Sequence, residues 1–310
     1  MSESNKRNFI VHGSILAIAG ILVRIIGMLY RIPVVNIIGS EGNGIYGVAF
    51  NIYNIMLVLS SYGLPMAVSK LVSARFTKKR YKSAAKVLRC SLMVAVCTGG
   101  IAALLVFFGA SFIENVIYGG GLPGLAVPLR ILAPTIFLVA ILGVIRGFFQ
   151  GQSTMIPTAV SQILEQIVNA IVSIAAGYGM MKAFASLPDV AAYGAAGSTL
   201  GTAMGALTAV LFMGFLYAVY TPTFNRLKRK DRHTENQSTG QICKIIIYTM
   251  IPIILGQTFY QISALIDDVM FSNIMVGRDI TKSISMDLGN FSSSYSLLIG
   301  IPQGVASAMS

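Results

Sequence analysis

Eight long apolar runs follow one another along this chain, and they constrain its fold more than any other feature. A helix needs about 20 apolar residues to cross roughly 30 Å of hydrocarbon. The runs of about this length cover residues 9–38, 46–70, 90–112, 128–149, 156–181, 194–220, 245–270 and 294–310. Only 11% of the residues are charged, whereas a soluble domain carries about 25%. The sequence therefore predicts an all-α, polytopic bundle of transmembrane helices.

The Lys and Arg residues are unevenly divided between the two sides of such a bundle. Dense basic clusters lie at 75–89, between the second and third runs, and at 226–244, between the sixth and seventh. The loops of the opposite side, such as 113–127 and 182–193, hold few basic residues. Because cytoplasmic loops are enriched in Lys and Arg, this asymmetry predicts a cytoplasmic N-terminus.

The formal net charge of +12 could by itself suggest a nucleic-acid-binding protein. Here, however, the basic clusters adjoin apolar runs, where anionic lipid attracts each basic residue by about 1 kcal/mol. We therefore expect anionic membrane lipids, and no nucleic acid, as partners of the basic loops.

The longest polar stretch divides the runs into two groups. Residues 1–220 hold six runs and are predicted to form a complete six-helix lobe. Residues 221–244 are polar and basic, which predicts a cytoplasmic linker. Residues 245–310 hold two runs, helices 7 and 8 of a second and incomplete lobe. The last run has no charged flank, so we expect this sequence to be a fragment of a longer chain.

Charged side chains within a membrane are costly and usually mark a functional site. Arg24 lies near the middle of the first run, and Arg31 follows two helical turns later on the same face. Gly20 and Gly27 share this face and leave space beside the arginines. We predict that Arg24 and Arg31 bind the substrate. The alternative for Arg31 is that its side chain extends to the outer interface.

The fifth run carries Glu165, the only acid deep within the first six runs. Three roles are open: a counter-ion for Arg24, a proton carrier, or a structural partner for a neighbouring helix. Charge pairing or ion coupling is the favoured prediction. The polar neighbours of this acid on the same run are Gln162, Gln166, Asn169 and Ser173.

The seventh run also has a polar face. Gln257 and Gln261 are predicted substrate contacts, and Asp267 and Asp268 are predicted to take part in charge pairing or ion coupling. The two acids lie near the outer end of the run, so a hydrated mouth of the bundle is an equal alternative.

The second run carries Asn51 and Asn54 on one side, and we include both in the predicted substrate site. Aromatic residues lie on its other side, where packing is the simpler interpretation. The polar faces of the first, fifth and seventh runs together predict a central cavity that is cationic beside the first run. Since the planar fork of Arg binds phosphate oxygens in pairs, such a cavity favours an anionic lipid headgroup.

The sequence contains no pattern typical of an enzyme. It has no phosphate-binding GxxxxGK[ST] loop, and its two histidines, His12 and His233, lie too far apart in the sequence for an HExxH zinc site. Cys90, Cys97 and Cys243 have no CxxC spacing and are interpreted as reduced packing residues. We therefore predict no catalytic activity, no metal and no cofactor.

Several segments resemble one known family. These are the stretch from Arg24 to Pro33, the loop from Gly39 to Tyr46, and Gly63 to Lys70. Further matches are Arg146–Gly151 and Ile301–Ala306. They are similar to the polysaccharide-biosynthesis or stage V sporulation protein B branch of the MOP exporter superfamily, whose relatives include MurJ-type lipid II flippases, O-antigen flippases and MATE multidrug exporters.

This resemblance implies a two-lobe bundle that works by alternating access in a bacterial cell membrane. It implies an undecaprenyl-diphosphate-linked saccharide as substrate, such as a peptidoglycan or spore-cortex precursor, with cell-wall synthesis proteins as candidate partners. Arg24 matches a family arginine that holds the diphosphate, whereas Arg31 is displaced by one residue. A MATE-type ion-coupled drug antiporter and a membrane scaffold for cell-wall enzymes are the alternatives.

Overall fold

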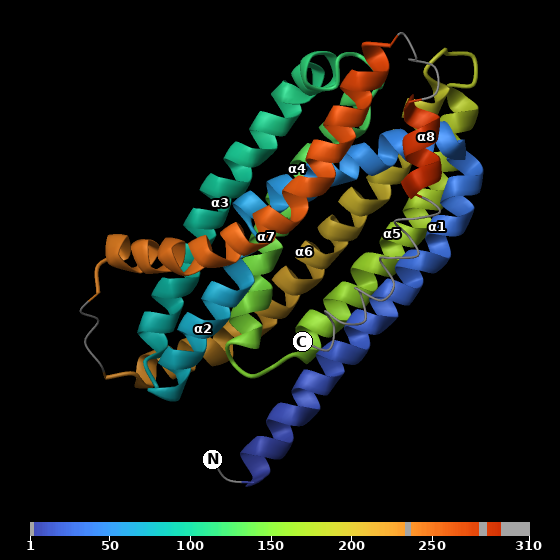
Figure 1. Cartoon of the computed structure of the whole chain (residues 1–310). Coiled ribbons are helices and arrows are strands. Elements are labelled where there is room, and N and C mark those ends of the chain that lie inside the picture. Colours follow the sequence, from blue (N-terminus) through green and yellow to red (C-terminus); the bar gives the residue numbers. More distant parts are fainter. Residues whose placement is uncertain (1–2, 233–236, 279–283, 293–310) are drawn as a thin grey trace.

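The computed structural model describes residues 3–232, 237–278 and 284–292, and this part of the chain is helical with no strand. Figure 1 shows the arrangement of the helices. The elements are α1 (Glu3–Ser60), α2 (Leu64–Thr77), α3 (Tyr81–Phe112), the π-helical turn η1 (Ile113–Ile117), α4 (Ala126–Gln150), α5 (Ile156–Ala183), α6 (Val190–Lys230), α7 (Thr239–Val276) and α8 (Ile284–Phe291). The predicted all-α bundle is confirmed.

Six helical segments of the described residues are long and apolar enough to cross a membrane, and the first of them, Leu16–Thr77, runs through α1 and α2 and so includes most of the first predicted span and all of the second. Many apolar side chains point outward, among them Phe108, which is 75% exposed, and Phe215, which is 65% exposed. A soluble protein buries such groups, whereas a bilayer solvates them. The protein is therefore a multi-pass membrane protein. The eighth predicted span, 294–310, lies outside the described residues.

Helix α1 consists of two arms that meet at Gly39. This residue has φ 71° and ψ 177°, in a region of positive φ that a side chain would disfavour. The chain therefore reverses direction here, and Figure 1 shows the second arm of α1 running back across the bundle. The second arm ends at Ser60, so the predicted span 46–70 is in fact broken. Pro65, at the start of α2, accounts for the break because it cannot continue a helix from the preceding arm.

The connection between α3 and α4 is fixed by a carboxylate. Both oxygens of Glu114 accept hydrogen bonds from backbone amides at the start of α4, from Gly124 N at 3.0 Å and from Ala126 N at 2.7 Å. These amides have no partner within their own helix, and a negative charge there also suits the helix dipole. The cap sets where α4 begins.

Helices α5 and α6 pack through glycines at intervals of four residues. A Cβ atom on Gly201 would lie 2.6 Å from the carbonyl oxygen of Asn169, and one on Gly205 would lie 2.6 Å from that of Glu165. The two backbones thus approach as closely as glycine permits, as the small-residue pattern predicts for membrane helices.

Both basic clusters lie at one end of the bundle. Figure 1 places the turn between α2 and α3 and the ends of α6 and α7 near each other, on the same end as the N-terminus. The connections from α3 to α4 and from α5 to α6, together with the kink in α1 and with α8, lie at the other end. The arrangement matches the alternation of loops expected from the charges, while the cytoplasmic location of the N-terminus stays a prediction.

Two predicted loops are partly helical. Helix α6 continues to Lys230 and α7 begins at Thr239, so both ends of the predicted linker 221–244 are helical. Basic residues in the last turn of α6 suit the negative end of the helix dipole, and a capping box formed by Ser238 and Gln241 starts α7. Helix α8 likewise lies between the predicted spans 245–270 and 294–310.

Candidate functional site

Arg31 lies on the first arm of α1 and turns toward neighbouring elements. Its Nη2 donates a 2.9 Å hydrogen bond to Ser292 Oγ, just after α8, and its guanidinium carbon lies 5.6 Å from the centre of the Tyr46 ring. Its Nε is buried, and no acceptor among the described residues reaches it. The guanidinium is thus a half-buried cation with donor capacity to spare.

Arg24 is exposed and lies roughly 10 Å along the same arm from Arg31, at 1.5 Å per residue. The two glycines that flank it differ in their surroundings. A Cβ atom on Gly20 would meet nothing within 4 Å, whereas one on Gly27 would lie 3.1 Å from Gln166 Nε2. Open space therefore exists beside Gly20, while the amide of Gln166 fills the space beside Gly27.

Glu165 of α5 is paired with a residue of α4. Its Oε2 accepts a 2.7 Å hydrogen bond from Arg146 Nη2, and the two side chains are 26% and 14% exposed respectively. Arg146 Nε also donates to Ser161 Oγ at 2.9 Å. Glu165 thus forms an ion pair that joins α4 and α5, while ion coupling by this acid stays a prediction. Sequence reasoning missed the pair because Arg146, at the end of an apolar run, gives no sign of which helix lies beside it.

The rest of the polar stripe on α5 holds helices together. Asn169 donates to the Tyr30 hydroxyl of α1 at 3.2 Å and accepts from Ser173 Oγ at 2.9 Å. Ser173 Oγ also lies 2.8 Å from the backbone oxygen of Ser198 on α6. These contacts join α1, α5 and α6 and engage both the nitrogen and the oxygen of the Asn169 amide.

The predicted site residues of the second and seventh runs meet at one point. Asn51 Nδ2 on the second arm of α1 donates a 2.6 Å hydrogen bond to Asp268 Oδ2 on α7. Asp267 is exposed, and Asn54, Gln257 and Gln261 are half-buried. The structure thus brings together Asn51 and Asp268, while the other three polar side chains line half-buried surfaces of α1 and α7.

Helix α8 crosses the second arm of α1 at a pair of glycines. A Cβ atom on Gly44 would collide with the backbone of Ser285, and one on Gly289 with the backbone of Ser40. Beside the crossing, buried Asn43 Nδ2 donates to the Gly289 oxygen at 2.8 Å. This close contact, together with the bond from Arg31 to Ser292, places α8 over the kink end of α1.

A family profile described as "Polysaccharide biosynthesis protein" matches residues 10–310. The chain belongs to this family. It thereby lies in the polysaccharide-biosynthesis branch of the MOP exporter superfamily, as the sequence resemblance indicates.

Two curated relatives from Bacillus subtilis (strain 168) are similar over part of their length. Lipid II flippase MurJ is 34% identical over 176 residues, which cover 55% of this chain and 32% of that protein. Stage V sporulation protein B is 31% identical over 209 residues, which cover 67% of this chain and 39% of that protein. The chain thus matches well under half of the length of each.

Solved structures of the superfamily share the fold. An inward-facing multidrug resistance MATE family transporter superimposes with a TM-score of 0.65 at 17% identity, covering 94% of this chain and 64% of that one. A MOP superfamily transporter from Pyrococcus furiosus, described as having a binding pocket of reversed polarity, gives a TM-score of 0.61 at 16% identity and covers 96% of this chain and 67% of that one. The predicted MATE-like fold is confirmed for this member of the family.

Proposed function

We propose that this protein translocates a saccharide linked to undecaprenyl diphosphate, such as a peptidoglycan or spore-cortex precursor, by alternating access. The observation that carries the proposal is the cationic face of α1. Arg31 keeps a buried Nε without an acceptor among the described residues, and Arg24 lies two turns away beside the open space at Gly20. A diphosphate has the oxygens to fill both guanidinium forks.

The relatives support the same substrate class. One B. subtilis relative, MurJ, is named as a lipid II flippase, and the other, stage V sporulation protein B, is named for sporulation. Both belong with this chain at 31–34% identity over the matched segments. The Pyrococcus transporter described as having reversed pocket polarity shows that members of this fold vary the charge of the pocket.

Alternating access needs contacts that can open. Arg31 and Asn51 contact α8 and α7 from the two arms of α1, through Ser292 and Asp268. A diphosphate that binds Arg31 would compete with Ser292 for the same donor, and would thereby weaken the hold of α8 on α1. With no ATP-binding motif in the sequence, membrane potential or an ion gradient would supply the driving force.

The alternative function is an ion-coupled antiporter of the MATE type. The observation in its favour is the carboxylate of Asp268 on α7, which accepts a 2.6 Å hydrogen bond from Asn51. In that mechanism Asp267, Asp268 and Glu165 are essential and the arginines are dispensable. The two functions therefore predict opposite outcomes for substitution of Arg24 and Arg31.

The deciding experiment is rescue of a bacterium depleted of its own lipid II flippase by the full-length protein. We expect Arg24→Ala and Arg31→Ala to abolish rescue and to weaken lipid II binding in detergent by at least about 30-fold, because each removes a guanidinium that would hold the diphosphate. Arg130→Ala is the matched control, since this guanidinium binds Ser111 on the exposed surface. Rescue by the arginine variants, combined with its loss in Asp268→Asn, would favour the antiporter.

A further inference from the structure

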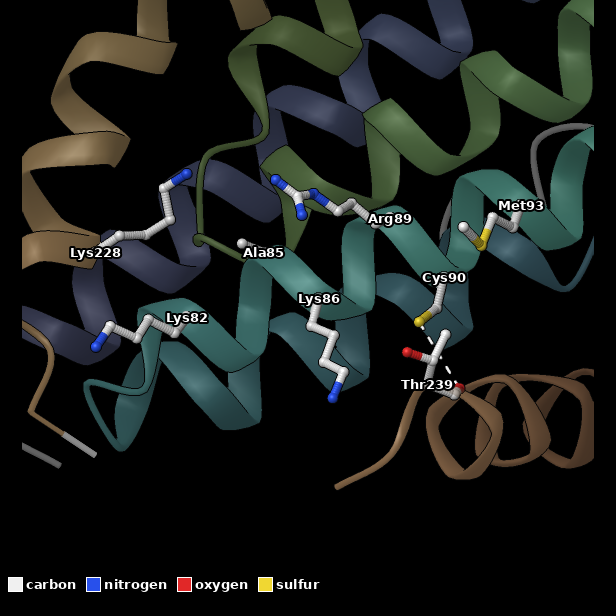
Figure 2. A pocket seen from close by; sticks show the side chains of 8 residues that line it. All are labelled: Lys82, Ala85, Lys86, Arg89, Cys90, Met93, Lys228 and Thr239. Atoms are coloured by element: carbon white, nitrogen blue, oxygen red, sulfur yellow. Dashed lines mark hydrogen bonds between the residues drawn. The ribbon is translucent and has the colours of Figure 1, made fainter. Parts of the chain in front are cut away.

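A cavity of about 480 Å³ opens at the basic end of the bundle, far from Arg31 and the kink. Figure 2 shows Lys82, Lys86 and Arg89 leaving successive turns of α3, with Lys228 of α6 and Thr239 of α7 beside them. The remaining lining residues are Ala85, Cys90 and Met93. Three helices that are distant in the sequence thus contribute to one pocket.

The charged side chains that line this pocket, as far as the structure describes it, are positive. Its described lining holds four cationic side chains and no carboxylate. The nearby acid, buried Asp231, uses Oδ2 to accept a 2.9 Å hydrogen bond from the backbone amide of Lys82. Because Lys82 lies in the first turn of α3, the positive end of the helix dipole adds to the field at that end of the pocket. Such a site favours a compact anion with several acceptor oxygens, and a phosphate has this form.

An apolar stripe continues from the cations along the same face of α3. At intervals of three or four residues, the face of α3 that carries Lys82, Lys86 and Arg89 next carries Met93, and further along it carries Val96 and Leu104. The exposed fractions of these three apolar side chains are 58%, 47% and 58%. A free phosphate ion would use the cations and leave this stripe unused. A phospholipid would use both, with its headgroup among the cations and an acyl chain along the stripe.

We propose that this pocket binds the phosphate headgroup of an anionic phospholipid from the leaflet at the basic end of the bundle. The bound headgroup also fastens the start of α7. Lys86 Nζ donates to the backbone oxygen of Gln237, just before α7, and Thr239 at the start of that helix lines the pocket. A lipid held here bridges α3, α6 and α7. The site is separate from the α1 arginines, and the inference stands whether or not those arginines bind a diphosphate.

The test is native mass spectrometry of the full chain in detergent, titrated with phosphatidylglycerol or with phosphatidylcholine of the same acyl chains. We expect phosphatidylglycerol to bind at least about 10-fold more tightly, because it lacks the cationic choline and leaves the phosphate charge unbalanced. Equal affinity for the two lipids would overturn the proposal. Soluble glycerol 3-phosphate is the second probe, and binding as tight as that of phosphatidylglycerol would exclude a lipid site.

The double variant Lys82→Gln/Arg89→Gln should lose about 10-fold or more in affinity for phosphatidylglycerol. The matched control is Lys78→Gln/Arg226→Gln, which removes the same charge from exposed positions of the same end outside the pocket. We expect the control to bind like the parent protein. An equal loss of affinity for phosphatidylglycerol in both double variants would show that the total charge of this end of the bundle, and not the pocket, attracts the lipid. That result would overturn the proposal. Thermal unfolding without added lipid, expected to be unchanged in both variants, separates lost binding from lost folding.

Discussion

The α5–α6 interface and the α1–α8 contact both depend on glycine, but they differ in every other respect. Helices α5 and α6 follow each other in the chain and meet along a repeated series of glycines, where Ser173 of α5 donates to the Ser198 oxygen of α6. Helix α8 meets α1 at one crossing, Gly44 against Gly289, more than 240 residues apart. The first contact is extended and local, and the second is small and remote.

This difference assigns a mechanical role to each contact. A long interface of interlocked small residues cannot slide without unpacking its whole length. The contact of the eight-residue α8 is shorter: bonds from Asn43 and Arg31 and the burial of Ile284 contribute to it, and it can separate without unpacking a long interface. We therefore expect α4, α5 and α6 to move as one body, with α8 docking and undocking from α1.

The largest effect is expected for Gly201→Leu in α6. Its side chain would meet the Asn169 oxygen and the Ser173 nitrogen of α5, both 2.6 Å from a Cβ atom. Since backbone atoms cannot move aside, we expect a loss of about 3 kcal/mol or more and little folded protein. Size-exclusion chromatography and thermal unfolding after detergent extraction measure this. The control is Gly214→Leu on the same helix, where a Cβ atom meets nothing within 4 Å.

Arg146→Gln should have the next largest effect, because it leaves the carboxylate of Glu165 uncompensated. A fully buried pair would lose 3–5 kcal/mol. Here the side chains are 14% and 26% exposed, so we expect about 2–3 kcal/mol. Adding Glu165→Gln should restore most of the stability. A thermal midpoint of Arg146→Gln equal to that of the exposed control Arg130→Gln would contradict a structural role for the pair.

Gly289→Val should weaken the α1–α8 crossing by about 2 kcal/mol and leave the α5–α6 body folded. A disulfide can report this. Cβ atoms of Gly47 and Ser292 would lie 3.7 Å apart, within the range that a disulfide requires. In a background without the native cysteines, Gly47→Cys/Ser292→Cys should cross-link readily and Gly289→Val should lower the yield. Gly256→Val, at a position of α7 with open space, is the control. An equal drop in cross-linking yield in both variants would refute a specific role for the glycine crossing.

The sequence predicted most helix positions but few of the contacts. Apolar length locates a span because hydrocarbon thickness is fixed, so α3, α4 and α5 lie where the runs indicate. The partner of Glu165 depends on which helices are neighbours, and nothing at Arg146 reveals this. Helix α8 escaped prediction because it is short and mixes polar residues with glycine, and its place is set by contact with α1.

The smallest effect is expected for Asn51→Leu, which removes the 2.6 Å bond to Asp268. Such a bond to a charged acceptor contributes about 1–2 kcal/mol, so the cross-link between positions 47 and 292 should form several-fold more slowly if α7 and α8 move together. Asn54→Leu is the matched control, one turn further on the same arm and half-buried. Slower cross-linking in Asn51→Leu alone would indicate that α7 and α8 move together with the second arm of α1. Unchanged rates in both variants would mean that α8 undocks independently of α7, and would confine the moving contact to the glycine crossing.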